Sequence, residues 1–189
     1  YMAFYPGPGL GGHCIPIDPF YLSWKAKQSG FAPRFIELAG HINGGMPHYV
    51  VDKIAEALNT KRKAINGSKV LIAGVAYKRD IDDMRESPAI PLVEGLLAAG
   101  ARVQVHDPRA TESARTIFGD RVLYAADPYS AAHGADALVI VTEWRMYRNP
   151  DLDRLKLLLR RPLVIDGRNI FEPKQIRALG FTYSSIGRP

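Results

Sequence analysis

From residue 69 onward, short apolar segments alternate with helical ones, and this alternation constrains the fold more than any other feature of the 189 residues. Residues 70–75, 137–142 and 163–165 are apolar at nearly every position rather than at every second one, as in strands of a sheet that is covered on both faces. The expected strands lie at Val70–Val75, Arg102–His106, Ala137–Thr142, Leu163–Ile165 and Phe181–Tyr183. The sequence therefore predicts an α/β fold with a parallel, Rossmann-like sheet over residues 69–189.

Two helices between these strands have recognisable ends. Ser87 is expected to be the N-cap of the first, which runs to Ala99, with Pro88 at its first position and Gly100 as its stop signal. The second is predicted over Asp151–Leu159. Helices that join parallel strands cover the faces of the sheet, which agrees with the doubly covered strands.

Upstream of the sheet, apolar residues recur every three or four positions, which is typical of one face of a helix. They are Phe35, Leu38, Ile42, Met46, Val50, Ile54 and Leu58. Gly44, Gly45 and Pro47 interrupt this run, so we expect a kink or two consecutive helices. The polar stretch from Thr60 to Ser68 is predicted to link this segment to the sheet.

Composition and charge narrow the classes of partner. The net charge of +6 comes from scattered lysines and arginines without a nucleic-acid-binding motif, so we expect no nucleic acid partner, while a solvated basic surface or a phosphate-bearing metabolite stays open. No apolar run approaches 18 residues, so no membrane partner is expected.

The cysteine count bears on the compartment. A single cysteine cannot form an internal disulfide, which predicts a cytoplasmic protein. Tyr1–Tyr5 reads as the end of a strand, which predicts a piece of a longer chain.

The segment 6–19 combines four glycines with the single cysteine. Gly7, Gly9 and Gly12 have the spacing of a dinucleotide-binding fingerprint, but no complete strand precedes them, and prolines follow where a helix should open. The glycines instead permit close approach of backbone to a ligand. Cys14, directly after them, is either a nucleophile beside that ligand or an inert buried residue.

Three motifs, in order along the chain, resemble those of the UDP-glucose/GDP-mannose dehydrogenase family. Gly9–Asp18 resembles the active-site loop of the family, Ala76–Pro88 resembles its second signature, and Asp166–Asn169 resembles a third. Together they span most of the chain. The resemblance implies an enzyme that oxidises the C6 alcohol of a nucleotide sugar to a carboxylate with two molecules of NAD.

The resemblance also assigns catalytic roles. Cys14 matches the nucleophile that forms a thiohemiacetal and then a thioester, which water hydrolyses. Asp18 matches a carboxylate that helps to order the water or the base, and its alternative role is that of a helix N-cap. No metal is expected, and Asp82 and Asp83 are assigned to helix-start charge and domain packing.

The positions that match the binding residues of the family fall into two sets. The UDP-sugar is expected to contact the loop and the sheet edge through Tyr5, Pro6, Gly7, Pro8, Gly9, Leu10, Gly11, Tyr77, Lys78 and Arg168. The NAD is expected to contact this chain through Cys14, Ile15, Pro16, Ile17 and Arg85. Most of the NAD site, together with the catalytic lysine of the family, is expected in an amino-terminal half that these residues do not include.

The loop residues also bear on the sugar. Members that oxidise UDP-glucose usually have serine before the nucleophile, whereas this chain has His13 and the run Ile15–Phe20, which resembles the branch that acts on UDP-N-acetylhexosamines. UDP-N-acetylglucosamine is the first expectation, UDP-N-acetylmannosamine the second and UDP-glucose the alternative.

The expected organisation is an active-site loop at 1–20, a helical dimerisation segment at 21–62 and a UDP-binding domain at 69–189. A homodimer is expected through helix 34–58, and the chain by itself is expected not to turn over substrate. The rival reading is a non-catalytic module that binds UDP and dimerises.

Overall fold

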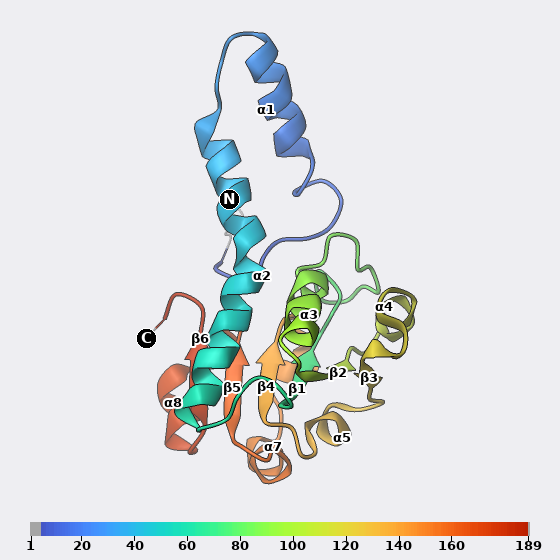
Figure 1. The fold of residues 1–189 in the computed structure, drawn as a ribbon, viewed down its shortest axis with the longest axis vertical. Helices are drawn as coiled ribbons and strands as arrows, with labels where there is room; N and C mark the ends of the chain where they lie inside the picture. Colours follow the sequence, from blue (N-terminus) through green and yellow to red (C-terminus); the bar gives the residue numbers. More distant parts are fainter. Residues whose placement is uncertain (1–4, 189) are drawn as a thin grey trace.

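The structure, a computed structural model, describes residues 5–188, so the strand end predicted over Tyr1–Tyr5 lies almost wholly outside the described residues. Six strands form one sheet, with the order β3-β2-β1-β4-β5-β6 and every neighbouring pair parallel (Figure 1). The strands are β1 (Lys69–Ala73), β2 (Arg102–His106), β3 (Leu123–Tyr124), β4 (Ala137–Ile140), β5 (Leu163–Asp166) and β6 (Thr182–Ser185). The predicted α/β class and parallel sheet are confirmed.

Helices connect the strands and cover the sheet, and the middle strands β1, β4 and β5 are apolar and buried almost throughout. The connecting elements are α3 (Ala89–Ala98), α4 (Thr111–Phe118), η1 (Gly119–Arg121), α5 (Pro128–Ala132), α6 (Arg145–Arg148), α7 (Leu152–Leu158) and α8 (Pro173–Ala178). The predicted start of α3 is displaced, since its N-cap is Pro88 rather than Ser87. The Ser87 hydroxyl still accepts a hydrogen bond from the amide of Ala89 at 3.3 Å, as a capping side chain would.

Two helices precede the sheet, and together they project from it as an antiparallel pair (Figure 1). They are α1 (Asp18–Gln28) and α2 (Arg34–Thr60). Gly40 of α2 leaves room for the ring of Phe20, since a Cβ at position 40 would lie 2.3 Å from that ring. The Ser23 hydroxyl donates to the Glu37 carboxylate at 3.0 Å, so a polar contact also joins the two helices.

Helix α2 runs unbroken for 27 residues, so the predicted alternative of two consecutive helices is wrong. Pro47 lies inside the helix and lacks an N–H group, which leaves the carbonyl of Asn43 without its helical donor. Packing offsets this loss, because Val50, Ile54 and Leu58 are buried in the same core as the sheet. Within residues 5–188, no helix is long and apolar enough to cross a membrane.

The strand order reverses between β1 and β4, which lie side by side while their crossovers lead to opposite ends of the sheet. In open α/β sheets, ligands bind at such a switch point, outside the carboxyl ends of the strands. The turns after β1, β4 and β5 meet at that edge, and they contain Lys78, Glu143 and Arg168.

Candidate functional site

The glycine loop, residues 5–14, lies across the carboxyl edge of the sheet. A Cβ on Gly7 would be 3.0 Å from Nη1 of Arg168, and one on Gly11 would be 2.5 Å from the carbonyl oxygen of Glu86. Gly12 has a φ of +102°, and a Cβ there would lie 2.9 Å from the ring of Tyr77. The loop therefore needs its glycines for close packing against the protein as well as for any contact with a ligand.

The other predicted loop residues differ in accessibility. Pro8 and Gly9 are buried, against Gly167 and Pro88 respectively. Leu10 is partly exposed, and its amide donates to the side-chain oxygen of Asn43 on α2 at 2.8 Å. Pro6 is exposed, and Tyr5 is 82% exposed, so a ligand can reach the outer end of the loop.

Cys14 is exposed, which excludes the inert buried role for this thiol in the described structure. Its carbonyl accepts hydrogen bonds from the amides of Ile17 at 3.1 Å and Asp18 at 2.8 Å, so the start of α1 holds the cysteine backbone. Its sulfur lies 3.9 Å from Nδ1 of His13. A reactive thiol needs solvent access and a polar neighbour, and Cys14 has both.

Asp18 is the first residue of α1, and the N-cap position is occupied by Ile17 with no capping side-chain hydrogen bond. The N-cap alternative for Asp18 is therefore not found. Pro19 occupies the first turn, where a missing N–H group costs nothing. Asp18, Ile15 and Ile17 are exposed beside the thiol, and Pro16 is half-buried.

Tyr77 and Lys78 follow β1 at the switch point. Tyr77 is half-buried under the glycine loop, and its amide donates to the carbonyl of Asp83 at 3.1 Å. Lys78 is exposed, with its ammonium group 5.5 Å from the centroid of the Tyr77 ring. The aromatic ring steadies the cation without neutralising it, so its charge stays available to an anion.

Arg168 lies just beyond β5 and is more enclosed than a surface arginine. Its Nε donates to the carbonyl of Val141 at 2.6 Å, Nη2 lies 3.5 Å from the carbonyl of Tyr77, and Nε is 3.3 Å from the Glu143 carboxylate. Burial lowers the pKa of Arg168, and Glu143 opposes that shift. An arginine remains protonated under such a shift. It joins the turns after β1, β4 and β5 while directing Nη1 at the glycine loop.

Arg85, expected at the NAD, is exposed and engaged with Asp83. Its Nε lies 2.9 Å and its Nη2 2.6 Å from the same carboxylate oxygen, and its carbonyl accepts from the amide of Gly12 at 2.9 Å. The ion pair holds the pKa of Asp83 below its usual range and raises that of Arg85. The expected helix-start role of Asp83 is wrong, because α3 begins only at Ala89.

Asp107 is a central residue of this edge that the sequence reading missed. It is buried directly after β2, and its carboxylate accepts from the amides of Val75 at 2.7 Å and Ala76 at 3.1 Å, and from the Trp144 indole at 3.2 Å. Its other oxygen accepts from the amides of Arg109 and Ala110. Asp107 could have been predicted from the sequence, because an acidic residue at the end of the second strand is a recurring feature of Rossmann-like sheets.

A cavity of about 650 Å³ lies on the other side of the glycine loop, between α1, α2 and the start of α3. Its lining includes Leu10, Phe20, Asn43 and Pro88 but not Cys14, Lys78 or Arg168. It shares Gly9 and Leu10 with the residues that match the nucleotide-sugar site, and Ile15 and Pro16 with those that match the NAD site. Among residues 5–188, no group of three or more His, Cys, Asp or Glu side chains is placed to hold a metal ion.

The fold and the site define a Rossmann-like α/β protein with Lys78 and Arg168 in the turns at the switch point and an exposed thiol at the end of the loop that packs there. The UDP-binding domain of the UDP-glucose/GDP-mannose dehydrogenase family matches residues 71–173, and the central domain of the same family matches residues 1–44. The chain belongs to the UDP-glucose/GDP-mannose dehydrogenase family.

Its relatives are dehydrogenases of more than one sugar. The chain is 42% identical to a UDP-glucose 6-dehydrogenase of Rhizobium meliloti, over 97% of this chain and 41% of that protein. It is 32% identical to a UDP-N-acetyl-D-mannosamine dehydrogenase of Methanococcus maripaludis, over 96% of this chain and 40% of that protein. An NDP-N-acetyl-D-galactosaminuronic acid dehydrogenase structure from Methanosarcina mazei superposes with a TM-score of 0.86 at 32% identity, over 98% of this chain and 40% of that one. The chain thus spans about two fifths of the length of these relatives.

Proposed function

We propose that this chain is the UDP-binding and nucleophile-bearing part of an NAD-dependent UDP-sugar 6-dehydrogenase. The observation that carries the proposal is the path of the glycine loop, which packs against Tyr77 and Arg168 and ends at the exposed Cys14. A nucleoside diphosphate held at the switch point would therefore have its sugar beside a thiol. The proposed organisation is an active-site loop at 1–20, a helical segment at 21–62 and a UDP-binding domain at 69–189.

Two cations and the loop backbone supply the diphosphate contacts in this proposal. Lys78 offers an ammonium group whose only described contact is the face of Tyr77, and Arg168 directs Nη1 at the loop. Charge-assisted hydrogen bonds of this kind are stronger than neutral ones. Tyr5 to Gly11 would then line the rest of the nucleotide sugar.

The chain contributes the covalent part of the reaction. The Cys14 sulfur attacks the C6 aldehyde to give a thiohemiacetal, whose oxidation gives a thioester that water hydrolyses to the carboxylate. When bound, NAD accepts the hydride in each of the two oxidations. The exposed Asp18 would order the hydrolytic water near Cys14.

The residues of this chain could form only a small part of an NAD site. Ile15 and Ile17 are exposed close to the thiol in sequence, and Arg85, although paired with Asp83, is also exposed, so a nicotinamide could reach all three. In the turn after β1, where a dinucleotide-binding sheet offers backbone amides to the pyrophosphate, the amides of Val75 and Ala76 already donate to the Asp107 carboxylate. This supports our proposal that the main NAD site lies elsewhere in the enzyme, in which case the 189-residue chain alone should not reduce NAD.

For the sugar we propose a UDP-N-acetylhexosamine, with N-acetylglucosamine first and N-acetylmannosamine second. The support is the loop sequence, in which His13 and Ile15–Phe20 resemble that branch of the family. UDP-glucose is the alternative, supported by the 42% identity to the Rhizobium meliloti enzyme. Rates of NAD reduction by the whole enzyme with these three UDP-sugars decide the matter, and a preference for UDP-glucose would overturn our choice.

Calorimetric titration of the chain with UDP tests the proposed binding site. Lys78→Ala and Arg168→Ala should each weaken binding tenfold or more, since one charge-assisted contact is worth roughly 1.5–3 kcal/mol. Arg102→Ala is the matched control, because Arg102 is an exposed cation at the start of β2, on the opposite edge of the sheet. Unchanged affinity in both site variants would place the nucleotide elsewhere.

A further inference from the structure

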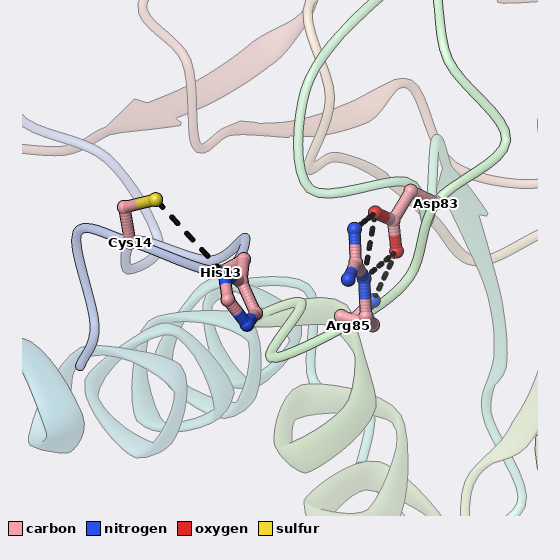
Figure 2. A network of polar contacts seen from close by, with 4 residues as sticks. All are labelled: His13, Cys14, Asp83 and Arg85. Atoms are coloured by element: carbon pink, nitrogen blue, oxygen red, sulfur yellow. Dashed lines mark hydrogen bonds and ion pairs between the residues drawn. The ribbon is translucent and has the colours of Figure 1, made fainter.

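The imidazole of His13 lies beside the thiol of Cys14 at the end of the glycine loop. The Cys14 sulfur and His13 Nδ1 are 3.9 Å apart, and both residues are exposed (Figure 2). The loop around them is held, because the amide of Gly12 donates to Arg85 and the carbonyl of Cys14 accepts from the start of α1. Hydrogen bonds therefore hold the backbone on both sides of His13 and Cys14, although neither side chain is buried.

An ion pair from the turn after β1 lies on the other side of the imidazole. In Figure 2 the His13 ring lies between the Cys14 sulfur and the Asp83–Arg85 ion pair. Asp83 is kept anionic chiefly by hydrogen bonds from Arg85, and the charge of His13 lowers the pKa of Asp83 further.

We infer that His13 is a catalytic residue, the base that removes the proton from the Cys14 thiol. The inference rests on the proposed function, and it assigns to His13 a task that the loop resemblance left open. A thiol that attacks an aldehyde must lose its proton, and a neighbouring histidine is a common acceptor.

The S–H proton passes to Nδ1 of His13, and the sulfur electron pair forms the S–C bond to C6 of the aldehyde. The electron pair of the C=O bond moves to the oxygen, which becomes the hydroxyl of the thiohemiacetal when it takes a proton from the imidazolium. In thioester hydrolysis, the imidazole, now neutral, takes a proton from the attacking water, whose oxygen bonds to C6. The C–S bond then breaks with its electron pair on sulfur, and the imidazolium protonates the leaving thiolate.

Other charged groups lie near Cys14 and His13, so their effect on the reactivity of the thiol has to be distinguished from that of His13. Arg85 interacts electrostatically with Cys14 and with Tyr77, whose ring packs on Gly12. Asp83 pairs with Arg85, and Asp18 begins the helix that holds the carbonyl of Cys14. Arginine does not titrate near neutrality, so it cannot produce a step in thiol reactivity at the pH where a histidine titrates.

Alkylation kinetics of this chain with iodoacetamide measure the thiolate directly, because Cys14 is its single cysteine. The rate is followed from pH 5 to pH 10 for the unmodified chain and for His13→Asn, which keeps a polar side chain but cannot accept the proton. His133→Asn is the matched control, since His133 is an exposed histidine at the end of α5. Far-UV circular dichroism verifies that all three proteins are folded.

We expect the unmodified chain and the control to gain reactivity in two steps as the pH rises, because the lower step depends on His13. His13→Asn should lose the lower step and keep the upper one, in which the thiol ionises without a neighbouring base. At pH 7 its alkylation should be roughly three- to tenfold slower, since a lone thiol is only a few per cent ionised there. A single step in the unmodified chain, or a His13→Asn profile that superposes on it, overturns the inference. No UDP-sugar is present, so this result is independent of the UDP titration that tests the proposed function.

Discussion

The exposed sulfur of Cys14 is the group on which the proposed covalent chemistry depends. In the whole enzyme, Cys14→Ala should abolish uronate formation, because neither the thiohemiacetal nor the thioester can form. Cys14→Ser retains a weaker nucleophile and should accumulate an ester that hydrolyses slowly. Product formation followed by chromatography measures both effects. Uronate release by Cys14→Ala at more than a few per cent of the parent rate would remove Cys14 from the nucleophile role.

Single residues also show how far the sequence predicted the site. Cys14, Lys78 and Arg168 were predicted because a recognisable motif surrounds each of them, and their site roles stay predictions, although the structure brings their loops to one edge. Asn43 was missed because it lies in the middle of a helix. Its side chain accepts from Leu10, a contact over 33 positions that no local pattern reveals.

The turn after β1 is fixed from three neighbouring elements. Asp107 accepts from the amides of Val75 and Ala76, the Ser87 hydroxyl donates to the carbonyl of Val75 at 2.7 Å, and that of Thr142 donates to the carbonyl of Ala76 at 2.6 Å. All three side chains are buried. The turn that leads to Tyr77 and Lys78 is therefore rigid, with its backbone groups satisfied by side chains.

Asp107→Ala should loosen this turn. Several buried donors would lose their acceptor, so we expect a loss of about 2–4 kcal/mol in the free energy of unfolding and weaker UDP binding. Urea denaturation and calorimetry measure the two effects. Asp127→Ala is a matched control, since this carboxylate also accepts backbone amides but caps the exposed start of α5. Equal effects of both variants on UDP affinity would contradict a specific role for Asp107.

Sequence periodicity predicted the existence and type of the long elements better than their limits. Strand β2 matches its predicted range, while β3 was missed because two residues carry no periodic pattern. The expected alternative of two consecutive helices over α2 is wrong, because the core packing of its second half outweighs the missing hydrogen bond of Pro47.

Helix α2 is buried only at its carboxyl-terminal end. Val50 is 1% exposed, so it is already used within the chain, whereas Phe35, Leu38 and Ile42 are 89%, 56% and 59% exposed. The dimer surface that we propose is therefore limited to the outer half of α2, residues 34–46, rather than the whole of 34–58. A contiguous apolar surface of this kind is typical of a protein interface.

Leu38→Asp with Ile42→Asp should convert the proposed homodimer to a monomer, because charge would be buried without a partner. Sedimentation velocity at micromolar concentration measures the assembly. Leu157→Asp, which changes an 87% exposed leucine on α7, should leave the dimer intact. A monomeric unmodified chain with a folded α2 would refute the interface.

Over the whole molecule, the buried His106 links global stability to pH. It is 3% exposed at the end of β2, and its Nδ1 lies 2.6 Å from the Tyr147 hydroxyl, which also donates to the carbonyl of His106 at 2.8 Å. Burial lowers the pKa of His106, although Asp107 and Asp127 act in the opposite direction. The folded state thus prefers the neutral imidazole.

The sign of the linkage follows from that preference. Below pH 6.5 the unfolded chain binds a proton that folded His106 resists, so stability falls as the pH decreases until the folded pKa is reached. For one group the slope is at most about 1.4 kcal/mol per pH unit. Urea denaturation at pH 7.5 and pH 5.5 should show a smaller pH-dependent loss for His106→Gln than for the unmodified chain. His133→Gln, at an exposed histidine, controls for histidines that are not buried. Whatever the absolute stability of His106→Gln, an undiminished loss between the two pH values would mean that acid destabilises the fold through its carboxylates instead.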